Sequence, residues 1–249
     1  FFIFVDGYLF SLKRWYIKAI TPLSGLIWFK FTPKDLLIDS NSSINIDIMS
    51  FLSIDCSTSA NSLFIKAKNK TFSKILQSDK TSNDLLMKEI LVFFAENDLN
   101  FNHISKIFVN QGPGSFSGLR TSLSIAKGIS LSKNLDLLGY NTFIWSCAKF
   151  FKKNDTIFSL IKIRDKYFIQ GFKKNLKNPS KPEEISEKEI LKKYEKKFKV
   201  IPGNIANQFD TKILNLDNLN IVDLDHNELE FLHIKGLLDD KLIKPLYLH

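Results

Sequence analysis

The chain has 249 residues, of which 44% are hydrophobic and 24% charged, and this composition suits a globular protein with a sizeable core, in one domain or two lobes. A net charge of +9 first points to nucleic acid, but the only arginines are Arg14, Arg120 and Arg164, so a solvated lysine surface is the better interpretation. Cys56 and Cys147 form no C-x-x-C pair, which favours a reducing, cytoplasmic compartment. The four histidines have no ligand-like spacing, so we expect no metal site.

Residues 1–48 differ in character from the rest of the chain. The longest uncharged run, Ala19–Phe29, is shorter than the roughly 20 residues that a membrane-spanning helix needs. The basic residues follow the apolar start, which is the wrong order for a signal peptide. Met49 immediately precedes a well-patterned strand. We hypothesise that translation begins at Met49 and that residues 1–48 are a non-native, poorly structured or loosely packed extension.

Three short strands are predicted over residues 49–57, 61–67 and 71–77, and their short connections indicate a meander. Asp55 lies at the exit of the first strand. An acidic residue at this place binds magnesium in kinase-like folds, but here no glycine-rich phosphate turn follows it. We therefore interpret Asp55 as a structural hydrogen-bonding residue rather than a metal ligand.

The first long helix is predicted over residues 81–97, with Thr81 and Asp84 as an approximate capping box. Its apolar arc is wider than the single stripe of an ordinary surface helix. The arc therefore implies two burial partners, namely the sheet and either another part of this chain or another protein.

The next strand is predicted at residues 107–109, and glycine is concentrated in the stretch that follows it. Gly112-Pro113-Gly114 predicts a tight turn, and Ser115 and Ser117 are suited to cap a helix that begins near Gly118. The spacing matches neither a P-loop nor a dinucleotide loop. Two interpretations stay open: a packing device, which we favour, or an anion site. The site would comprise Gly112, Pro113, Gly114, Ser115, Gly118 and Arg120.

Small residues recur on the helix after this loop, at Ser122, Ala126 and Ser130. Small side chains allow a second helix to approach closely. The two helices would then form half of a four-helix interface with a partner, although their faces could instead meet only each other. The predicted interface residues are Leu85, Leu86, Ile90, Phe93, Phe94, Leu119, Ser122, Leu123, Ala126 and Ser130.

The remaining pattern alternates strands and helices. Ser186 and Glu189 form a good capping box. We expect a first lobe over residues 49–146 and a second lobe with a closing helix and tail over residues 147–249. The predicted strands are 136–140, 156–163, 167–172, 200–201 and 219–224, and the predicted helices are 142–151, 186–197, 204–214 and 225–238.

The nonapeptide GPGSFSGLR, residues 112–120, resembles the signature of the TsaB family, and the small-residue helix after it fits as well. Three weaker stretches agree in order: residues 51–58, 82–86 and 245–249. The chain departs from the family pattern at two positions. Gln111 stands where many members have glycine or another small residue, and Ser117 stands in place of threonine. The resemblance runs from Met49 to the end of the chain.

This resemblance implies an α/β, two-lobed actin-like or Hsp70-like (ASKHA) fold with ribonuclease-H-like lobes. It also implies a non-catalytic scaffold subunit that pairs with a TsaD-like subunit, with a TsaE-like ATPase joining and tRNA bound through the complex; a homodimer is an alternative. The complex would transfer threonylcarbamoyl to the adenosine beside the anticodon. TsaD holds a metal through two histidines on its first long helix, and residues 81–97 contain none. We therefore expect no catalysis, cofactor or metal.

Two other functions compete with this one. An ATP-binding enzyme of the same superfold would use the Gly112–Gly118 loop for phosphate, but the Lys-Ser/Thr of a P-loop is missing. A direct tRNA-binding module would need clustered lysines with aromatics on one face. The run at residues 188–199 is its only candidate, and a solvated helix explains that run more simply.

Overall fold

The computed structural model divides into two compact units, residues 1–48 and residues 49–249. In the first unit it describes the backbone of four strands, at residues 2–5, 8–11, 16–21 and 25–30. In the second it describes residues 49–248 except 59, 78–82, 152–155, 174–178 and 241–242, and not the side chains of 83 and 84. No helix in these described parts is long and apolar enough to cross a membrane.

The first unit is an antiparallel sheet in the order β1-β2-β3-β4. The sequence analysis did not predict these strands, because charged residues interrupt the apolar pattern. The hypothesis that translation begins at Met49 stays a prediction. The strands are β1 (Phe2–Val5), β2 (Tyr8–Ser11), β3 (Tyr16–Thr21) and β4 (Gly25–Lys30).

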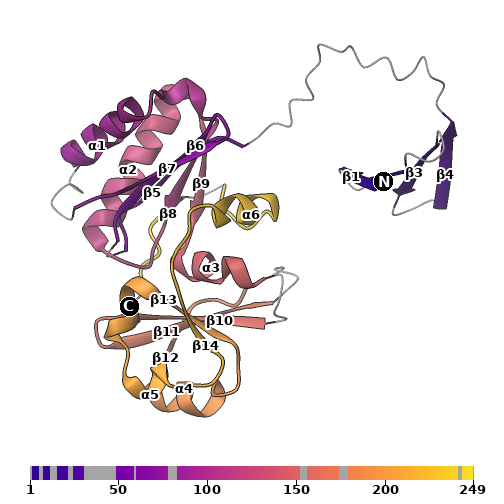
Figure 1. Ribbon diagram of the computed structural model, residues 1–249. Helices are drawn as coiled ribbons and strands as arrows, with labels where there is room; N and C mark the ends of the chain where they lie inside the picture. The colour runs from indigo at the N-terminus through magenta and orange to yellow at the C-terminus, as the bar shows by residue number, and fades with distance from the viewer. Residues whose placement is uncertain are drawn as a thin grey trace. The chain divides into compact units, whose positions relative to one another are not determined.

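The second unit contains two five-stranded sheets with the same topology (Figure 1). Each begins as an antiparallel meander of three strands, and two further strands then join in parallel beside the meander's first strand. The first sheet has the order β7-β6-β5-β8-β9, from β5 (Phe51–Asp55), β6 (Ser62–Ala67), β7 (Lys70–Ile75), β8 (Lys106–Asn110) and β9 (Asp136–Tyr140). The second has the order β12-β11-β10-β13-β14, from β10 (Thr156–Ile163), β11 (Lys166–Lys173), β12 (Glu183–Ile185), β13 (Lys199–Pro202) and β14 (Leu219–Val222).

Helices form layers on both sheets. The two longest, α1 (Asn83–Glu96) and α2 (Phe116–Lys133), cover the outer face of the first sheet (Figure 1). The second sheet is covered by shorter helices, and α3 and α6 lie between the lobes. These elements are α3 (Thr142–Cys147), α4 (Glu187–Lys193), α5 (Thr211–Leu214), α6 (Glu228–Ile234) and the 3-10 helices η3 (Phe101–His103), η4 (Ala148–Phe150) and η5 (Gly203–Gln208).

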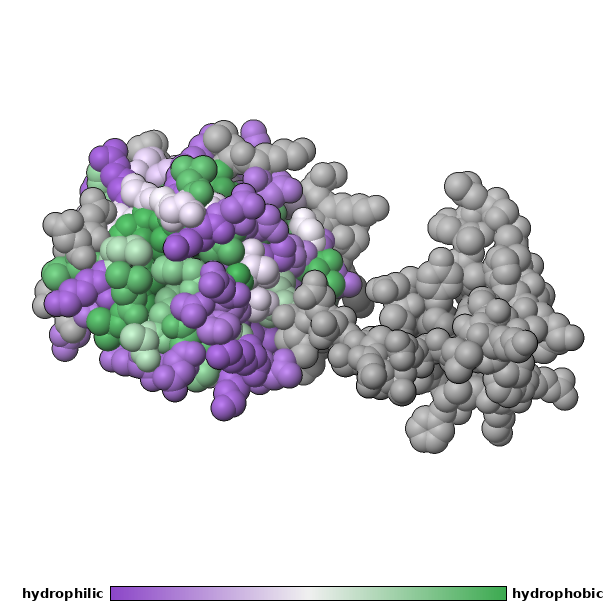
Figure 2. All heavy atoms as spheres, turned by 90° about the horizontal axis from the view of Figure 1, so that it is seen from above, coloured by the Kyte–Doolittle hydropathy of each residue, from purple (hydrophilic) through white to green (hydrophobic). Residues whose placement is uncertain are grey.

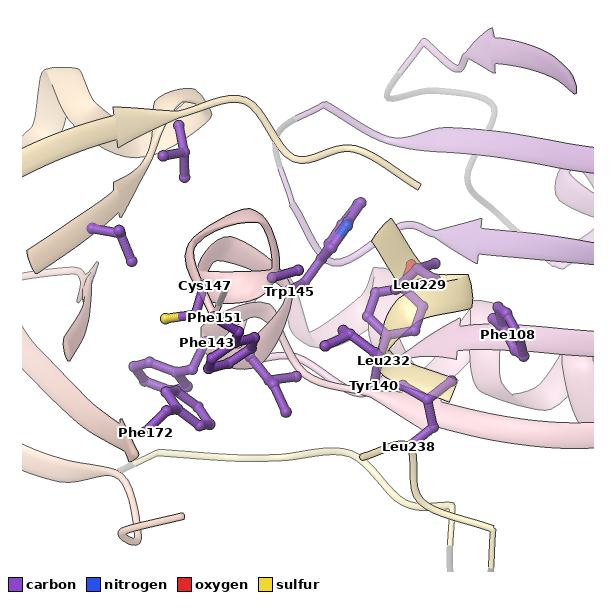
Figure 3. Packing of buried hydrophobic residues seen from close by; sticks show 14 of the residues in the cluster. Phe108, Tyr140, Phe143, Trp145, Cys147, Phe151, Phe172, Leu229, Leu232 and Leu238 are labelled. Atoms are coloured by element: carbon purple, nitrogen blue, oxygen red, sulfur yellow. The ribbon is translucent and has the colours of Figure 1, made fainter. Parts of the chain in front are cut away.

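A hydrophobic cluster around α3 joins the lobes (Figure 3). Phe143 and Trp145 of α3 belong to one cluster with Phe108 of the first sheet, Phe172 of the second and Leu232 of α6. Trp145 Nε1 donates to the Asp225 carbonyl at 2.8 Å, so its one polar atom is satisfied. Two further clusters lie beneath the outer helices of each sheet. The contiguous central cluster makes the two lobes one packed body.

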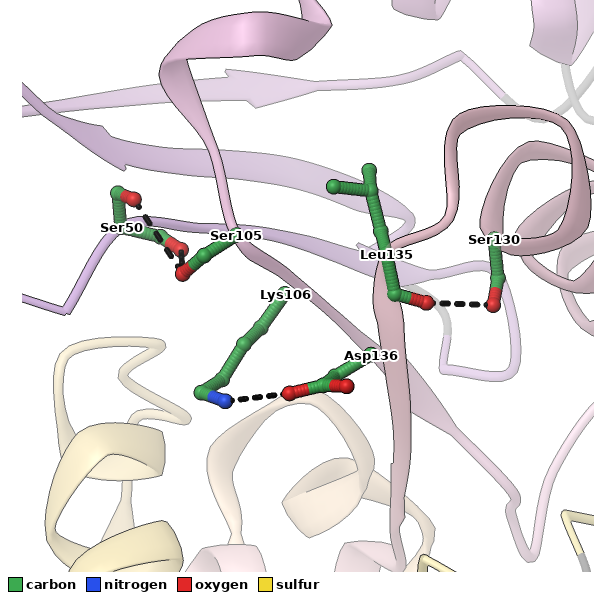
Figure 4. A network of polar contacts seen from close by, with 6 residues as sticks. All are labelled: Ser50, Ser105, Lys106, Ser130, Leu135 and Asp136. Carbon is green, nitrogen blue, oxygen red and sulfur yellow. Dashed lines mark hydrogen bonds and ion pairs between the residues drawn. The ribbon is translucent and has the colours of Figure 1, made fainter.

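Polar contacts tie down the amino ends of the parallel strands β5, β8 and β9 (Figure 4). Ser105 Oγ donates to the Ser50 carbonyl at 3.0 Å, and Lys106 pairs with Asp136 at 2.7 Å. Ser130 Oγ donates to the Leu135 carbonyl at 2.7 Å. Ser130, a predicted interface residue, thus fastens the turn between α2 and β9.

Most predicted elements agree with the structure to within a few residues. The predicted helix 204–214 is two short helices, η5 and α5, because the chain extends at Phe209 and Asp210 before α5. The predicted helix 225–238 contracts to α6, and the helix from Ser186 ends at Lys193 rather than near residue 197. Strand β12 was not predicted. The capping box at Thr81 lies outside the described residues.

Candidate functional site

The glycine-rich loop after β8 is built around the side chain of Asn110. Asn110 Oδ1 accepts the Gly112 N–H at 2.8 Å, and its Nδ2 donates to Asp55 Oδ1 and to Thr142 Oγ1, both at 3.1 Å. Gly112 has a φ of +100°, which favours glycine, and a cis bond joins it to Pro113. One buried amide therefore links the loop to β5 and to the start of α3.

Two glycines let this loop contact the turn after β5. A Cβ at Gly114 would stand 2.1 Å from the Ser57 carbonyl oxygen, and one at Gly118 would stand 1.7 Å from that of Cys56. A side chain at either position would collide with backbone. The glycines of the loop have different roles: Gly112 has a positive φ, and Gly114 and Gly118 allow close approach to backbone.

Asp55 has the structural role that its sequence context predicted. The carboxylate is buried and accepts hydrogen bonds from Ser57 N at 2.9 Å, Ser57 Oγ at 2.8 Å, Asn110 Nδ2 at 3.1 Å and Thr58 Oγ1 at 2.5 Å. Four donors satisfy both oxygens, so the chain itself fixes the turn after β5. The neighbouring Cys56 thiol is buried, and this burial, reinforced by Asp55, raises its pKa well above the usual range.

The loop's N–H groups are largely engaged within the chain. Ser115 N donates to the Ser57 carbonyl at 2.8 Å, and Leu119 N donates to the Ser115 carbonyl at 2.9 Å. Ser115 caps α2 as predicted, because its Oγ accepts the Gly118 N–H at 3.3 Å. These contacts favour the packing interpretation, and the anion site stays a prediction.

A cavity of about 610 Å³ lies beside this loop, between the lobes. The first lobe contributes Ser57 and Ser115, and the second contributes Lys162, Arg164 and Gln208. Lys162 Nζ donates to the Gln208 carbonyl at 2.8 Å. Arg120, the predicted cation of the anion site, does not line the cavity; it turns toward the carboxyl-terminal tail instead.

The predicted partner interface is corrected by the burial of its residues. Helix α1 packs on the sheet and on α2, and α2 packs on β8 and β5, so the chain supplies both burial partners of the apolar arc. Of the predicted set, Leu85 is exposed and Ser130 is half-buried. The others are buried in the chain's own core: Leu86, Ile90, Phe93, Phe94, Leu119, Ser122, Leu123 and Ala126.

The small residues of α2 serve this internal packing. Ala126 and Ser122 are completely buried, and the Ser122 hydroxyl donates to the Leu119 carbonyl at 3.2 Å. Small side chains here let α2 lie close to the sheet. A large residue at Ala126 would disturb the core before it reached a partner.

The outward faces of α1 and α2 nevertheless carry large apolar side chains. The exposed fractions are 42% for Leu85, 49% for Leu91, 53% for Phe116 and 85% for Leu131. Figure 2 shows that hydrophobic and hydrophilic residues both lie on the face seen from above. We call these four residues the outer apolar set. Sequence reasoning found only Leu85; the exposed cations Lys88, Arg120 and Lys127 were the available signal, since cations mark the solvent side of a helix.

The carboxyl-terminal tail returns to the loop. Leu246 N donates to the Gln111 carbonyl at 2.7 Å, and Gln111 Nε2 donates to the Lys244 carbonyl at 3.0 Å. The Tyr247 ring lies 5.1 Å from that of Phe116. Gln111, where the resembling family has a small residue, therefore anchors the tail beside the start of α2.

A buried histidine joins the segment before α6 to the first sheet. His226 Nε2 lies 2.9 Å from Ser62 Oγ and Nδ1 lies 2.9 Å from Ser53 Oγ, while its ring stacks on Phe64. Burial lowers the pKa of His226 to about 3, against a smaller opposing effect of Asp225. The imidazole is therefore neutral at physiological pH, and it is a core residue.

Solved structures with the same architecture define the class of this protein. A YeaZ structure from Pseudomonas aeruginosa matches with a TM-score of 0.60 and 14% identity over 81% of this chain and 100% of that one. A crystal structure of an uncharacterized protein similar to peptidase YeaZ, also associated with Pseudomonas aeruginosa, matches with a TM-score of 0.61 at the same identity and coverage. The fold is thus the two-lobed α/β fold of the actin-like (ASKHA) type, as predicted.

Sequence comparison narrows this class. Residues 73–161 match the family model described as TsaD, tRNA N6-adenosine threonylcarbamoyltransferase. The tRNA threonylcarbamoyladenosine biosynthesis protein TsaB of Buchnera aphidicola subsp. Baizongia pistaciae is 33% identical over 88 residues, which are 35% of this chain and 40% of that protein. This chain is thus similar in sequence to a TsaB protein over 88 residues and similar in fold to YeaZ structures.

Proposed function

We propose that this chain is a non-catalytic subunit for threonylcarbamoyladenosine synthesis on tRNA. In this role it binds a TsaD-type catalytic subunit, with a TsaE-type ATPase joining the assembly, and supports transfer of threonylcarbamoyl to the adenosine beside the anticodon. The TsaB relative and the TsaD-type family model support the pathway. Because the match spans 40% of the relative's length, the pathway and the partners belong to the proposal.

One observation carries the scaffold role, namely the outer apolar set on two adjacent helices. Leu91, Phe116 and Leu131 are large apolar side chains exposed on these two helices, and exposed apolar surface of this kind is a feature of protein interfaces. Helix α1 packs on α2, so a single partner can contact both helices. This surface replaces the predicted interface residues that lie in the core.

The sequence of α1 supports a non-catalytic role. The helix contains no histidine, whereas the TsaD resemblance would require two there to hold a metal. The reacting centre would therefore belong to the partner, and this chain would contribute through the assembly.

Reconstitution tests the proposal. The full chain is combined with the TsaD-type and TsaE-type subunits of the same organism. A preformed, activated threonylcarbamoyl donor, labelled in its threonine, is supplied with ATP, and transfer of the label to tRNA is measured. We expect the three subunits together to modify tRNA and the mixture without this chain to be inactive. Binding to the TsaD-type subunit is measured separately by analytical ultracentrifugation. Full activity without this chain, or the absence of a complex between this chain and the TsaD-type subunit, would contradict the proposal.

The cavity beside the loop supports one alternative, an ATP-binding enzyme of the same superfold. Lys162 and Arg164 give this cavity a basic side, and Ser57 and Ser115 give it hydroxyls. Against this reading, several N–H groups of the loop are engaged by the chain itself. Calorimetry of the full chain with ATP and magnesium separates the two: micromolar binding favours the enzyme, and the scaffold role predicts no such binding.

A further inference from the structure

Arg120 stands on the outer face of α2 in an arrangement that other side chains hold in place. Its guanidinium carbon lies 3.9 Å from the centre of the Phe116 ring, and its Nε donates to the Tyr247 hydroxyl at 3.2 Å. Phe116 and Tyr247 also contact each other, with ring centres 5.1 Å apart. The three side chains form a cluster on the surface, and all three are exposed.

This cluster leaves the binding end of Arg120 available. Phe116 covers one face of the guanidinium and Tyr247 takes its Nε, so the two terminal Nη groups remain for another acceptor. Two parallel N–H groups fit a carboxylate or a phosphate in a bidentate way. A guanidinium already stacked and hydrogen-bonded loses less conformational freedom when it binds than a mobile side chain does.

The tail holds the cluster together. Tyr247 follows Leu246, whose N–H donates to the Gln111 carbonyl at 2.7 Å. This backbone contact to Gln111, the residue after β8, helps to fix the position of the neighbouring Tyr247. Tyr247 acts on Arg120 as a positioning residue.

Charge and polarity identify the kind of partner. Helix α2 contains Arg120, Lys127 and Lys133 and no acidic residue, so it attracts acidic groups. Leu131 and Phe116 are exposed on the same helix. Phosphate sites for nucleic acid collect cations with polar groups, whereas exposed aromatic rings beside an arginine, here Phe116 and Tyr247 beside Arg120, are typical of protein interfaces. The acceptor is therefore a side-chain carboxylate set in an apolar protein surface.

We propose that Arg120 is the specificity point of the α1–α2 surface, where it takes an Asp or Glu carboxylate of the partner subunit. This inference rests on the proposed scaffold function and adds the chemistry of recognition. Arg120 pairs with the carboxylate through its Nη groups, while the exposed Phe116 ring, which is stacked on the guanidinium, shields the pair from water. Such central arginines carry a large part of the binding energy in many interfaces.

Affinity measurements on the full chain test the inference. The dissociation constant for the TsaD-type subunit is measured by calorimetry for wild type, Arg120→Glu, Arg120→Lys and Tyr247→Phe. We expect the affinity to fall about 100-fold for Arg120→Glu and about 10-fold for Arg120→Lys. Lysine keeps the positive charge but lacks the two parallel N–H groups of the guanidinium. Tyr247→Phe should weaken binding by about threefold, and not further when Arg120 is already Lys.

A matched control and a charge swap make the test specific. Lys188→Glu makes the same change of sign at an exposed position of α4, on the second lobe, and should leave the affinity unchanged. An Asp→Arg or Glu→Arg variant of the partner should restore the binding of Arg120→Glu. Melting temperatures check that the variants are folded, and Arg120→Gln serves as a neutral second variant.

The outcomes distinguish the two proposals. If wild type does not bind the TsaD-type subunit, the scaffold function itself fails. If wild type binds and both Arg120→Glu and Arg120→Gln bind equally well, the scaffold function stands and the role of Arg120 is overturned. If Arg120→Glu instead loses tRNA binding by the chain alone and keeps the subunit, the acceptor is an RNA phosphate and the inference is again overturned.

Discussion

The two lobes have sheets of the same strand order and direction but differ in the helices that cover them. The first sheet carries α1 and α2, of 14 and 18 residues. The second carries α4 and α5, of 7 and 4 residues, with η5. Within the described residues, large exposed apolar side chains occur on α1 and α2 and not on α4 or α5.

This difference shows what the longer helices add. A sheet of five strands needs a cover for its apolar face, and the short helices of the second lobe provide it by burying Ile190 and Ile213. Helices α1 and α2 bury an equivalent inner face and also expose Leu85, Leu91, Phe116 and Leu131. The same topology thus supports a lobe covered by short helices and a lobe whose long helices carry the proposed docking surface.

The largest expected effect sharpens the contrast between the inner and outer faces of α2. Gly118→Ala would place a Cβ 1.7 Å from the Cys56 carbonyl oxygen, so either the start of α2 or the turn after β5 must move. We expect the free energy of unfolding to fall by about 4 kcal/mol, measured by urea denaturation. An unchanged unfolding midpoint would mean that the loop does not press against the turn after β5.

The second prediction concerns the second lobe, which contains a buried lysine. Lys199 Nζ lies 2.6 to 2.9 Å from four carbonyl oxygens, those of Tyr194, Glu195, Lys197 and Asp217, and its three N–H groups are shared among them. Lys199→Met keeps the length of the side chain and leaves these acceptors without their donor. We expect a loss of about 3 kcal/mol in urea denaturation. The exposed Lys188→Met change in the same lobe is the control and should alter stability by less than about 0.5 kcal/mol.

The third prediction uses the histidine that joins the α6 segment to the first sheet. The folded-state pKa of His226, about 3, lies below the unfolded value of 6.5, so the unfolded chain binds this proton first. Its contribution to stability is full above pH 6.5 and is lost as pH falls toward 3. We expect stability at pH 5 to be about 2 kcal/mol lower than at pH 8 from this group alone.

The comparison with His226→Gln isolates this effect. The variant is less stable at pH 8, but it lacks the titrating group and should lose less stability between pH 8 and pH 5. Parallel pH profiles for the two proteins would mean that His226 is not buried in the neutral form.

The smallest effect lies on the outer face of α2. A Cβ at Gly128 would meet nothing within 4 Å, and Gly128 is inside a helix. Gly128→Ala should therefore raise stability by about 0.5–1 kcal/mol, measured as a higher melting temperature. A loss of stability would show that the chain itself already covers this face, and the contrast within α2 would disappear.

Particular residues show how far the sequence could predict this structure. The Ser186–Glu189 capping box was predicted because its hydrogen bonds are local. Leu86 and Ala126 were assigned to a partner interface, but both are buried in the chain's own core. Neither a wide apolar arc nor a series of small residues says whether the sheet, a neighbouring helix or a partner covers it. Tyr247 next to Arg120 was not predicted, since the contact spans 127 positions of sequence.

The account is tested most directly by comparing two exposed apolar residues of similar exposure on opposite sides of the first sheet. Leu131 of α2 is 85% exposed and Ile75 of β7 is 80% exposed. Lys74 of β7 pairs with Glu89 of α1, so the Lys74 side chain lies on the face of the sheet that α1 covers. Ile75 follows Lys74 in the strand and therefore points to the opposite face. The affinity of the full chain for the TsaD-type subunit is measured for Leu131→Asp and Ile75→Asp. The account predicts that Leu131→Asp weakens binding by at least about 50-fold while Ile75→Asp leaves it within about twofold. Equal affinity for both variants, or a larger loss for Ile75→Asp, would contradict it.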